Sequence, residues 1–207
     1  MPDYNKIYLY RMTHIENIPH VLQYGITHSS SPNANPAFFP IGDSSLIATR
    51  SQFALDNGKL LGEYIPFYFG ARMPMLYVIQ KGYNLVKPTP AQDIVYCITS
   101  VQKIMERNLE YIFTDGHAVD SFSTQYGLED IEDIETLLDM KAIRAKYWKD
   151  ENDLDLKRRK EAEFLVLCDI PPTAVLGYLV YNETAKQKLL NFGVNGAVVH
   201  INSQSYF

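Results

Sequence analysis

The residues that first suggest chemistry are two glutamates at the end of a basic run. In KRRKEAEFLV, residues 157–166, four consecutive cations are followed by Glu161 and Glu163 and then by a segment typical of a strand. A carboxylate that leads into an apolar strand is costly to bury unless it is paired or used in a reaction. Two interpretations follow from the residues alone: the glutamates point to solvent, or one of them is functional.

Polar residues near the ends of other predicted elements are further candidates. Thr13 and His14 lie where the first predicted strand runs into a helix, which suits hydrogen bonds to the sugar or amide of a ligand. A helix N-cap is the structural alternative for Thr13. Arg50 follows a long loop, where it suits bidentate binding of a phosphate and equally suits an ordinary surface position. Each residue keeps both interpretations.

One strand end and one aromatic segment complete the candidate groups. In FTDGHA, Asp115 and His117 stand two residues apart, and a turn there can direct both into one cleft. Asp and Gly are also common in turns that have no function. Tyr68 and Tyr77 are most simply core residues, although a nicotinamide ring would stack on such an aromatic wall.

The charge distribution limits the class of partner. The formal net charge of −5 argues against binding nucleic acid through global charge, but much of the positive charge is concentrated in a few short segments such as KRRK. Such a segment forms either a local basic face for a polyanion or a solvated helix end. Both interpretations stay open on this segment alone.

The elements that must position these residues are short strands with helices between them. We expect strands at 7–14, 64–70, 94–100, 111–116, 163–172, 175–181 and 196–201. We expect helices at 15–25, 101–108, within 128–148 and at 185–193, a helix or an extended piece at 74–82, and an ordered loop at 26–50 anchored by Phe38, Phe39 and Ile41. Because strands and helices do not strictly alternate, the pattern favours an α+β fold.

Length and composition favour one folded domain over residues 1–207, since 46% of the residues are hydrophobic. The apolar runs are shorter than the roughly 20 residues that span a bilayer, which predicts a soluble, intracellular protein without a membrane partner. Cys97 and Cys168 lie in strand-like runs and are expected as reduced core thiols. Motifs of the common nucleotide folds, zinc hydrolases and serine hydrolases are missing from the sequence.

Four segments in this order resemble a known family: YRMTHIENIPHVLQYG, YIPFYFGARMPMLY, FTDGHA and KRRKEAEFLV. They are similar to the DarT toxins, the DNA ADP-ribosyltransferases of bacterial toxin–antitoxin pairs. The resemblance implies an α+β ADP-ribosyltransferase fold, with a split β-sheet core around an NAD cleft and flanking helices. It further implies a cytoplasmic monomer that uses NAD as co-substrate without a metal, modifies single-stranded DNA and is countered by a cognate antitoxin.

The resemblance also assigns roles to residues. The family's catalytic glutamate falls on Glu163 and its arginine on Arg50, while Glu161 is expected to face away. For NAD binding it implies Arg11, Thr13 and His14, to which the aromatic wall adds Tyr68 and Tyr77. For DNA binding it implies His117, to which the basic residues add Arg72, Lys157, Arg158 and Arg159.

The chain departs from the family pattern at Arg11, because the family has a histidine at that position of the HxTH segment. A neutral hydrogen-bond donor has become a permanent cation. If Arg11 faces the DNA, its donors favour the O6 and N7 acceptors of guanine, so guanine is slightly preferred as the target base and thymine is kept as the alternative. An ADP-ribosyltransferase of protein or RNA, and a noncatalytic nucleic-acid-binding module, are the competing functions.

Overall fold

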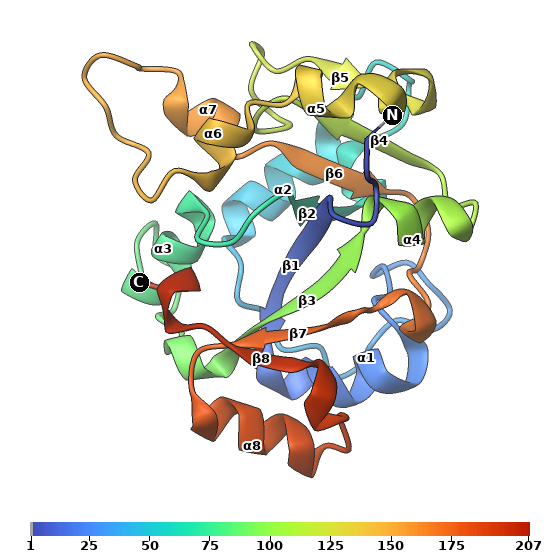
Figure 1. Ribbon diagram of the computed structural model, residues 1–207, viewed down its shortest axis with the longest axis vertical. Helices are drawn as coiled ribbons and strands as arrows, with labels where there is room; N and C mark the ends of the chain where they lie inside the picture. The colour runs from blue at the N-terminus through green and yellow to red at the C-terminus, as the bar shows by residue number, and fades with distance from the viewer. Residues whose placement is uncertain (1) are drawn as a thin grey trace.

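One mixed sheet of eight strands forms the centre of the computed structural model, which describes residues 2–207 (Figure 1). The sheet order is β5-β4-β6-β2-β1-β3-β7-β8. The strands are β1 (Tyr8–His14), β2 (Ile65–Tyr68), β3 (Ile94–Ser100), β4 (Tyr111–Thr114), β5 (Gln125–Tyr126), β6 (Glu163–Val166), β7 (Gly177–Val180) and β8 (Val199–Ile201). All neighbouring strands are antiparallel except β7 and β8.

The sheet is divided between β1 and β2. Tyr10 and Tyr68 are the one register pair that joins these strands, whereas β1 and β3 pair along seven positions. Beyond Tyr10 the two halves of the sheet separate, as the split in Figure 1 shows. The predicted α+β fold with a split sheet is therefore confirmed, and the split gives a substrate access to the strand edges inside the sheet.

Eight short helices within the described residues flank the sheet. They are α1 (Ile18–Tyr24), α2 (Ser44–Gln52), α3 (Pro74–Lys81), α4 (Val101–Glu106), α5 (Ile134–Leu137), α6 (Met140–Arg144), α7 (Leu156–Lys160) and α8 (Glu183–Asn191). The predicted glycine cap of α1 is present, since Gly25 adopts a φ of 83° and a Cβ there would lie 1.9 Å from the carbonyl oxygen of Ile170. The segment 74–82 is a helix, with a proline at its start and Gly82 in the left-handed region at its end.

Apolar residues fill both faces of the sheet. The largest buried cluster includes Leu9, Phe67 and Phe164, which belong to three neighbouring strands. Smaller clusters cover the other face on either side of the split, one around Leu165 and one around Tyr96. The row that passes from Glu163 through Tyr68 to Tyr10 crosses this second face, so the polar residues of the split lie between two apolar clusters.

The structure corrects three expectations. The segment 26–50 is not all loop, because its end forms α2, and its expected anchors Phe38 and Phe39 are half exposed. The helical period in 128–148 is present as two short helices and a 3₁₀ segment, but Cys168 is exposed, whereas Cys97 is buried. Over residues 2–207, no helix combines the length and hydrophobicity needed to cross a membrane.

Candidate active site

Glu163 is the first residue of β6, and its carboxylate is almost completely buried. The Arg50 guanidinium binds both carboxylate oxygens, at 3.0 Å from Nη1 and 2.8 Å from Nη2, and the backbone N–H of Ala118 donates a third hydrogen bond at 3.0 Å. Burial by itself raises the pKa of Glu163, but the Arg50 charge and the donated hydrogen bonds hold that pKa below its ordinary value. Glu163 is therefore an ionised carboxylate at the edge of the split.

Arg50 reaches Glu163 from the last turn of α2. The Asp43 side chain caps this helix by accepting from the backbone N–H groups of Ser45 and Leu46. The next turn of chain packs closely against α2, because a Cβ at Gly62 would lie 2.5 Å from the Cα of Ser51. A capped helix and this close approach together fix the direction of the Arg50 side chain, 113 positions away from its partner in the sequence.

The loop after β4 forms the second wall around Glu163. Thr114 accepts a hydrogen bond from the backbone N–H of Glu163, and Ala118 donates to its carboxylate. Burial lowers the pKa of His117 below its ordinary value, although the neighbouring Glu163 charge acts in the opposite direction. Asp115 does not share this cleft: it binds Arg158 at 3.0 Å and the backbone of Thr124, so the expectation that one turn directs both FTDGHA side chains into the cleft is wrong for Asp115.

Thr13 and His14 are the last residues of β1, on the β1 side of the split. Thr13 accepts a hydrogen bond from Asn17 at 2.9 Å, and His14, instead of Thr13, caps the following turn. The His14 ring stacks on Phe39 at 4.0 Å between centroids. Asn17 also binds the backbone N–H and carbonyl of Phe39. These contacts attach the loop before α2 to the strand end.

Asn17 is a residue of this region that the sequence did not single out, and Phe39 was expected there only as an anchor of the loop 26–50. The available signal was a polar amide, Asn17, just after the predicted strand-to-helix boundary; Thr13 lies in β1, so no helical spacing rule connects the two residues. Arg11 extends across the split and donates to the carbonyl of Pro66 at 2.9 Å, and burial lowers the pKa of its guanidinium to about 10. Arg11 lines one small cavity with Thr13 and Asn17.

The two tyrosines expected near NAD lie in different surroundings. Tyr68 is the β2 partner of Glu163 and belongs to the same row of the sheet. Tyr77 packs against Tyr83, Trp148 and Phe207, with ring centroids 5.1 to 5.6 Å apart. The structure thus brings Tyr68 to Glu163 and places Tyr77 in a separate aromatic cluster on α3.

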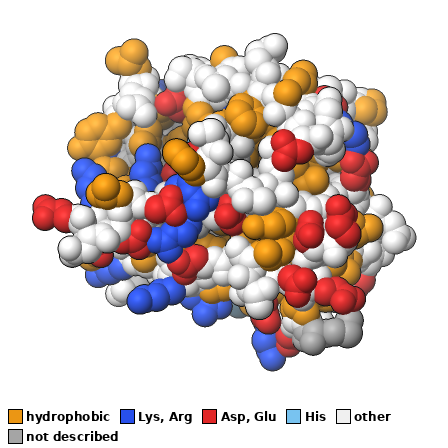
Figure 2. All heavy atoms as spheres, turned by 90° about the horizontal axis from the view of Figure 1, so that it is seen from above, with side chains coloured by type: hydrophobic (Ala, Val, Ile, Leu, Met, Phe, Trp, Pro, Cys, Tyr) orange, Lys and Arg blue, Asp and Glu red, His pale blue; other side chains and the backbone are white. Residues whose placement is uncertain are grey.

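The basic run forms α7, and most of its charges are neutralised inside the protein. Arg158 binds Asp115 and Asp155, and Arg159 binds three aspartates: Asp139, Asp153 and Asp155. Lys160 is buried and donates to two backbone carbonyls. Lys157 is the cation of this run that is exposed and forms no ion pair within residues 2–207. Red and blue side chains accordingly intermingle on the left of Figure 2.

Glu161 does not face away from the site, which corrects the expectation from the sequence. It follows the last turn of α7 and is 8% exposed, and burial raises the pKa of its carboxyl to about 7. The Glu163 charge lies close enough to raise that pKa further, and Lys157 partly offsets it. Glu161 and Glu163 thus form a pair of buried carboxyls in which only Glu163 has an arginine partner.

Replacing Glu161 with Gln is expected to stabilise the fold at pH 8. The folded-state pKa of about 7 lies above the ordinary 4.5, so the stability that Glu161 contributes is complete below pH 4.5 and is lost as the pH rises through 7. At pH 8 the variant should gain up to about 3 kcal/mol of unfolding free energy, and near pH 4.5 almost nothing. Thermal melts of both proteins across this range test the difference; equal shifts at both pH values would contradict it.

No group of three or more His, Cys, Asp or Glu side chains within residues 2–207 is arranged to hold a metal ion. The residues around the split are instead carboxylate, guanidinium, hydroxyl, amide and imidazole groups. Such a set can bind a nucleotide, stabilise a developing positive charge through Glu163 and accept a proton from an incoming nucleophile.

The comparisons with known proteins agree with this chemistry. A family model described as "ssDNA thymidine ADP-ribosyltransferase, DarT" matches residues 10–207. The DNA ADP-ribosyl transferase of Thermus sp. (strain 2.9) is 31% identical over 186 residues, which cover 88% of this chain and 85% of the relative. A DNA ADP-ribosyl transferase–DNA ADP-ribosyl glycohydrolase fusion protein of Thermosipho africanus is 28% identical over 182 residues, 87% of this chain and 44% of the fusion.

Solved structures show the same likeness in three dimensions. Thermus sp. 2.9 DarT in complex with ADP-ribosylated ssDNA superposes with a TM-score of 0.84 and 27% identity, covering 100% of this chain and 98% of the other. The same protein in complex with NAD+ gives a TM-score of 0.79 with 28% identity, covering 100% and 99%. The family match over nearly the whole chain, the relatives and the shared fold lead to one conclusion: the chain belongs to the DarT family of DNA ADP-ribosyltransferases.

Proposed function

We propose that this protein is a toxin that transfers ADP-ribose from NAD to a base of single-stranded DNA and releases nicotinamide. The observation that carries the proposal is the buried Glu163 carboxylate, held in its ionised form by Arg50 at the edge of the split sheet. A fixed anion at that point suits a reaction whose transition state develops positive charge. The Thermus relative is found in complex with NAD+ and with ADP-ribosylated ssDNA, which supports both substrates.

In this reaction the bond between C1′ of the ribose and the nicotinamide nitrogen breaks, and its electron pair leaves with neutral nicotinamide. The ribose becomes oxocarbenium-like, and the Glu163 carboxylate stabilises that charge. A nitrogen of the base then forms the new bond to C1′ and loses its proton, for which Glu163 is the acceptor in reach. Oε1 of Glu163 accepts from Arg50 and Ala118, whereas Oε2 accepts from Arg50 alone, so Oε2 keeps a lone pair for the proton of the base.

NAD is assigned to the β1 side of the split, at the end of that strand. Thr13, His14, Asn17 and Arg11 offer hydroxyl, imidazole, amide and guanidinium groups for the sugar, amide and phosphates of NAD. Tyr68 is proposed as the ring against which nicotinamide packs, since it lies beside Glu163. The assignment of Tyr77 to NAD stays a prediction from the sequence and receives no support from its position in the α3 cluster.

The favoured base is thymine instead of guanine. The preference for guanine depended on Arg11 facing the DNA, and Arg11 instead donates to Pro66 in the cavity of Thr13 and Asn17. The family model that matches the chain is itself described for thymidine. For thymine the reaction requires removal of the ring N–H proton, a step that the ionised Glu163 suits.

A partner that reverses the modification is part of the proposal. The Thermosipho relative joins a DNA ADP-ribosyl transferase to a DNA ADP-ribosyl glycohydrolase in one chain, which supports a glycohydrolase antitoxin for this toxin. With DNA as acceptor, the toxin would act in the cytoplasm, and we propose that it acts as a monomer. Growth of a bacterial host that expresses the protein with and without a glycohydrolase tests this partnership.

The decisive experiment follows label from NAD to its acceptor. The protein is incubated with labelled NAD and, separately, with single-stranded DNA, duplex DNA, RNA and protein. Label on single-stranded DNA alone supports the proposal, label on RNA or protein identifies a different transferase, and label on none indicates a binding module. Base-resolved mass spectrometry of the modified oligonucleotide then identifies the base and the attachment atom, and a guanine adduct would overturn the choice of thymine.

Lys157 is expected to contribute one phosphate contact to DNA binding. Because it is the exposed cation of α7 without an acidic partner, Lys157→Gln should weaken binding and reduce the slope of log affinity against log salt by about one. The matched control is Lys87→Gln, an equal loss of charge at an exposed position outside this region. An unchanged slope for Lys157→Gln would identify α7 as a solvated surface.

A further inference from the structure

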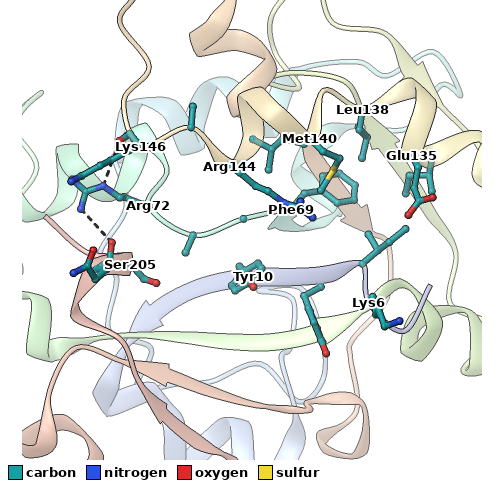
Figure 3. A pocket seen from close by; sticks show the side chains of 18 residues that line it. Lys6, Tyr10, Phe69, Arg72, Glu135, Leu138, Met140, Arg144, Lys146 and Ser205 are labelled. Carbon is teal, nitrogen blue, oxygen red and sulfur yellow. Dashed lines mark hydrogen bonds between the residues drawn. The ribbon is translucent and has the colours of Figure 1, made fainter. Parts of the chain in front are cut away.

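A cavity of about 580 Å³ lies on the opposite side of the Glu163 row from the proposed NAD residues. It is lined by the start of β1, the turn after β2, the α5–α6 segment and the C-terminal residues 204–205 (Figure 3). The proposed mechanism does not use it. Its volume falls within the range of sites that bind small organic groups.

The lining of this cavity combines cations with aromatic rings. Four basic residues and one acidic residue within residues 2–207 line it, in a protein whose net charge is −5: Lys6, Arg72, Arg144, Lys146 and Glu135. The aromatic residues of the lining are Tyr8, Tyr10 and Phe69. Positive charge with aromatic rings is the combination that binds single-stranded nucleic acid, because phosphates pair with cations and bases stack on rings.

Two of the cations are available to a ligand. Arg144 and Lys146 are exposed, and neither forms an ion pair within residues 2–207. Arg72 is already engaged, since its guanidinium donates to the carbonyl of Tyr206 and lies 4.0 Å from the Phe207 ring centroid. Arg72 therefore serves mainly to hold one wall, and Arg144 and Lys146 present the charge, as Figure 3 shows.

The backbone segment that carries Arg144 and Lys146 is held by the end of α7, the helix that leads into the catalytic strand β6. Lys160 is buried and donates to the carbonyls of Ile143 and Ala145, at 3.0 and 2.7 Å, on either side of Arg144. Burial lowers the pKa of Lys160 to about 8. A lysine three residues before Glu163 thus fixes the backbone that presents Arg144 and Lys146.

The position of the cavity relative to Glu163 indicates which reactant it receives. Tyr10 lines it and is joined through Tyr68 to Glu163 across two strand spacings, a distance of about 10 Å. Thr13 and His14 lie at the other end of β1, about 12 Å from Tyr10 along the strand. The cavity and the proposed NAD residues therefore flank the catalytic row from opposite sides, as a reaction requires in which the base enters while nicotinamide leaves.

We infer that this cavity binds the nucleotide next to the target base, with its base against the tyrosines and its phosphate at Arg144 and Lys146. The inference rests on the proposed function, because it names the substrate class of the same site. It assigns to this surface the positioning of the DNA strand, not the chemical step.

The first test removes charge from the cavity. In Arg144→Gln with Lys146→Gln, the KM for a short oligonucleotide that contains one target base should rise about tenfold, and the salt slope of binding should fall by about one, because both cations are assigned to one phosphate. The kcat and the KM for NAD should stay within about twofold, because neither residue contacts the donor. Arg107→Gln with Lys87→Gln, two exposed cations outside the cavity, is the matched control.

The second test is a double-mutant cycle, in which a substitution in the protein is combined with the removal of a base from the DNA. Tyr8→Ala should raise the KM about tenfold for an intact oligonucleotide. On an oligonucleotide with an abasic residue on one side of the target, 5′ or 3′, the same substitution should have no further effect, which also identifies the side. Equal losses on intact and abasic oligonucleotides, together with a charge variant that behaves like its control, would overturn the inference. If the wild-type protein modifies no oligonucleotide, the proposed function itself fails.

Discussion

Glu163→Gln is expected to lower the rate of ADP-ribose transfer by a hundredfold or more. The substitution keeps the size of the side chain but removes the negative charge that stabilises the oxocarbenium-like ribose and accepts the proton of the base. The affinity for NAD should change little, because the proposed ground-state contacts come from Thr13, His14 and Asn17. Single-turnover transfer from labelled NAD to a thymine-containing oligonucleotide measures the loss.

Glu161→Gln is the matched control for this prediction, since Glu161 is also a buried carboxyl but has no arginine partner. It should retain transfer to within a few fold. In a bacterial host, expression of the Glu161 variant should stop growth and expression of the Glu163 variant should be tolerated. A Glu163→Gln protein that still transfers at near the parental rate would remove Glu163 from the mechanism.

The folded state of the Glu163 variant must be verified separately. Breaking a buried ion pair by removing one charge costs about 3 to 5 kcal/mol, because the remaining charge has no partner. The Arg50 side chain retains only 13% exposure, so some loss of stability is expected. A thermal melt of the variant above the assay temperature shows that lost activity comes from lost chemistry and not from unfolding.

The sequence was sufficient to place Glu163 at the start of a strand because the relevant rule is local, and the family resemblance then selected it over Glu161. A basic helix end followed by an apolar run marks the start of β6, and the pleat then fixes the direction of the first side chain. Arg50 could not be found in the same way. Helix α2 buries no residue, so nothing in its own pattern indicates that Arg50 turns inward, and only the family resemblance selected it.

Other parts of the site depend on contacts that no local rule contains. Glu161 has no strand neighbour to direct it, and the turn that ends α7 folds it into the protein. Asp115 is drawn to Arg158, a partner 43 positions away, which separates it from His117. The long loop is held by Asn17 through backbone bonds to Phe39 instead of by buried aromatic rings. The positions of Asp115 and of the long loop are set by tertiary polar contacts, whereas Glu161 is placed by the turn that ends α7.

Arg50→Ala is expected to abolish measurable transfer and also to change the ionisation of Glu163. In the wild-type protein, Arg50 opposes the burial that raises the pKa of Glu163 and keeps that pKa below its ordinary value of 4.5. Without the guanidinium, burial dominates, and the pKa of Glu163 should rise above 4.5. Any residual activity should then increase with pH as the carboxyl ionises.

In Arg50→Ala, the contribution of Glu163 to the unfolding free energy should therefore change with pH in the direction opposite to its contribution in the wild-type protein. A depressed folded-state pKa gives stability that is present above the unfolded value and is lost as the pH falls through the folded pKa; a raised one gives stability that is lost as the pH rises. Melts between pH 4 and 8 should show the variant least impaired at low pH, with the deficit growing toward pH 8 to about 3 to 5 kcal/mol. Arg50→Lys restores the charge without the two-pronged contact, so it should recover the pH dependence but not the transfer rate. If Arg50→Ala turned over normally, or if its deficit were the same at every pH, Arg50 would not be the group that keeps Glu163 ionised.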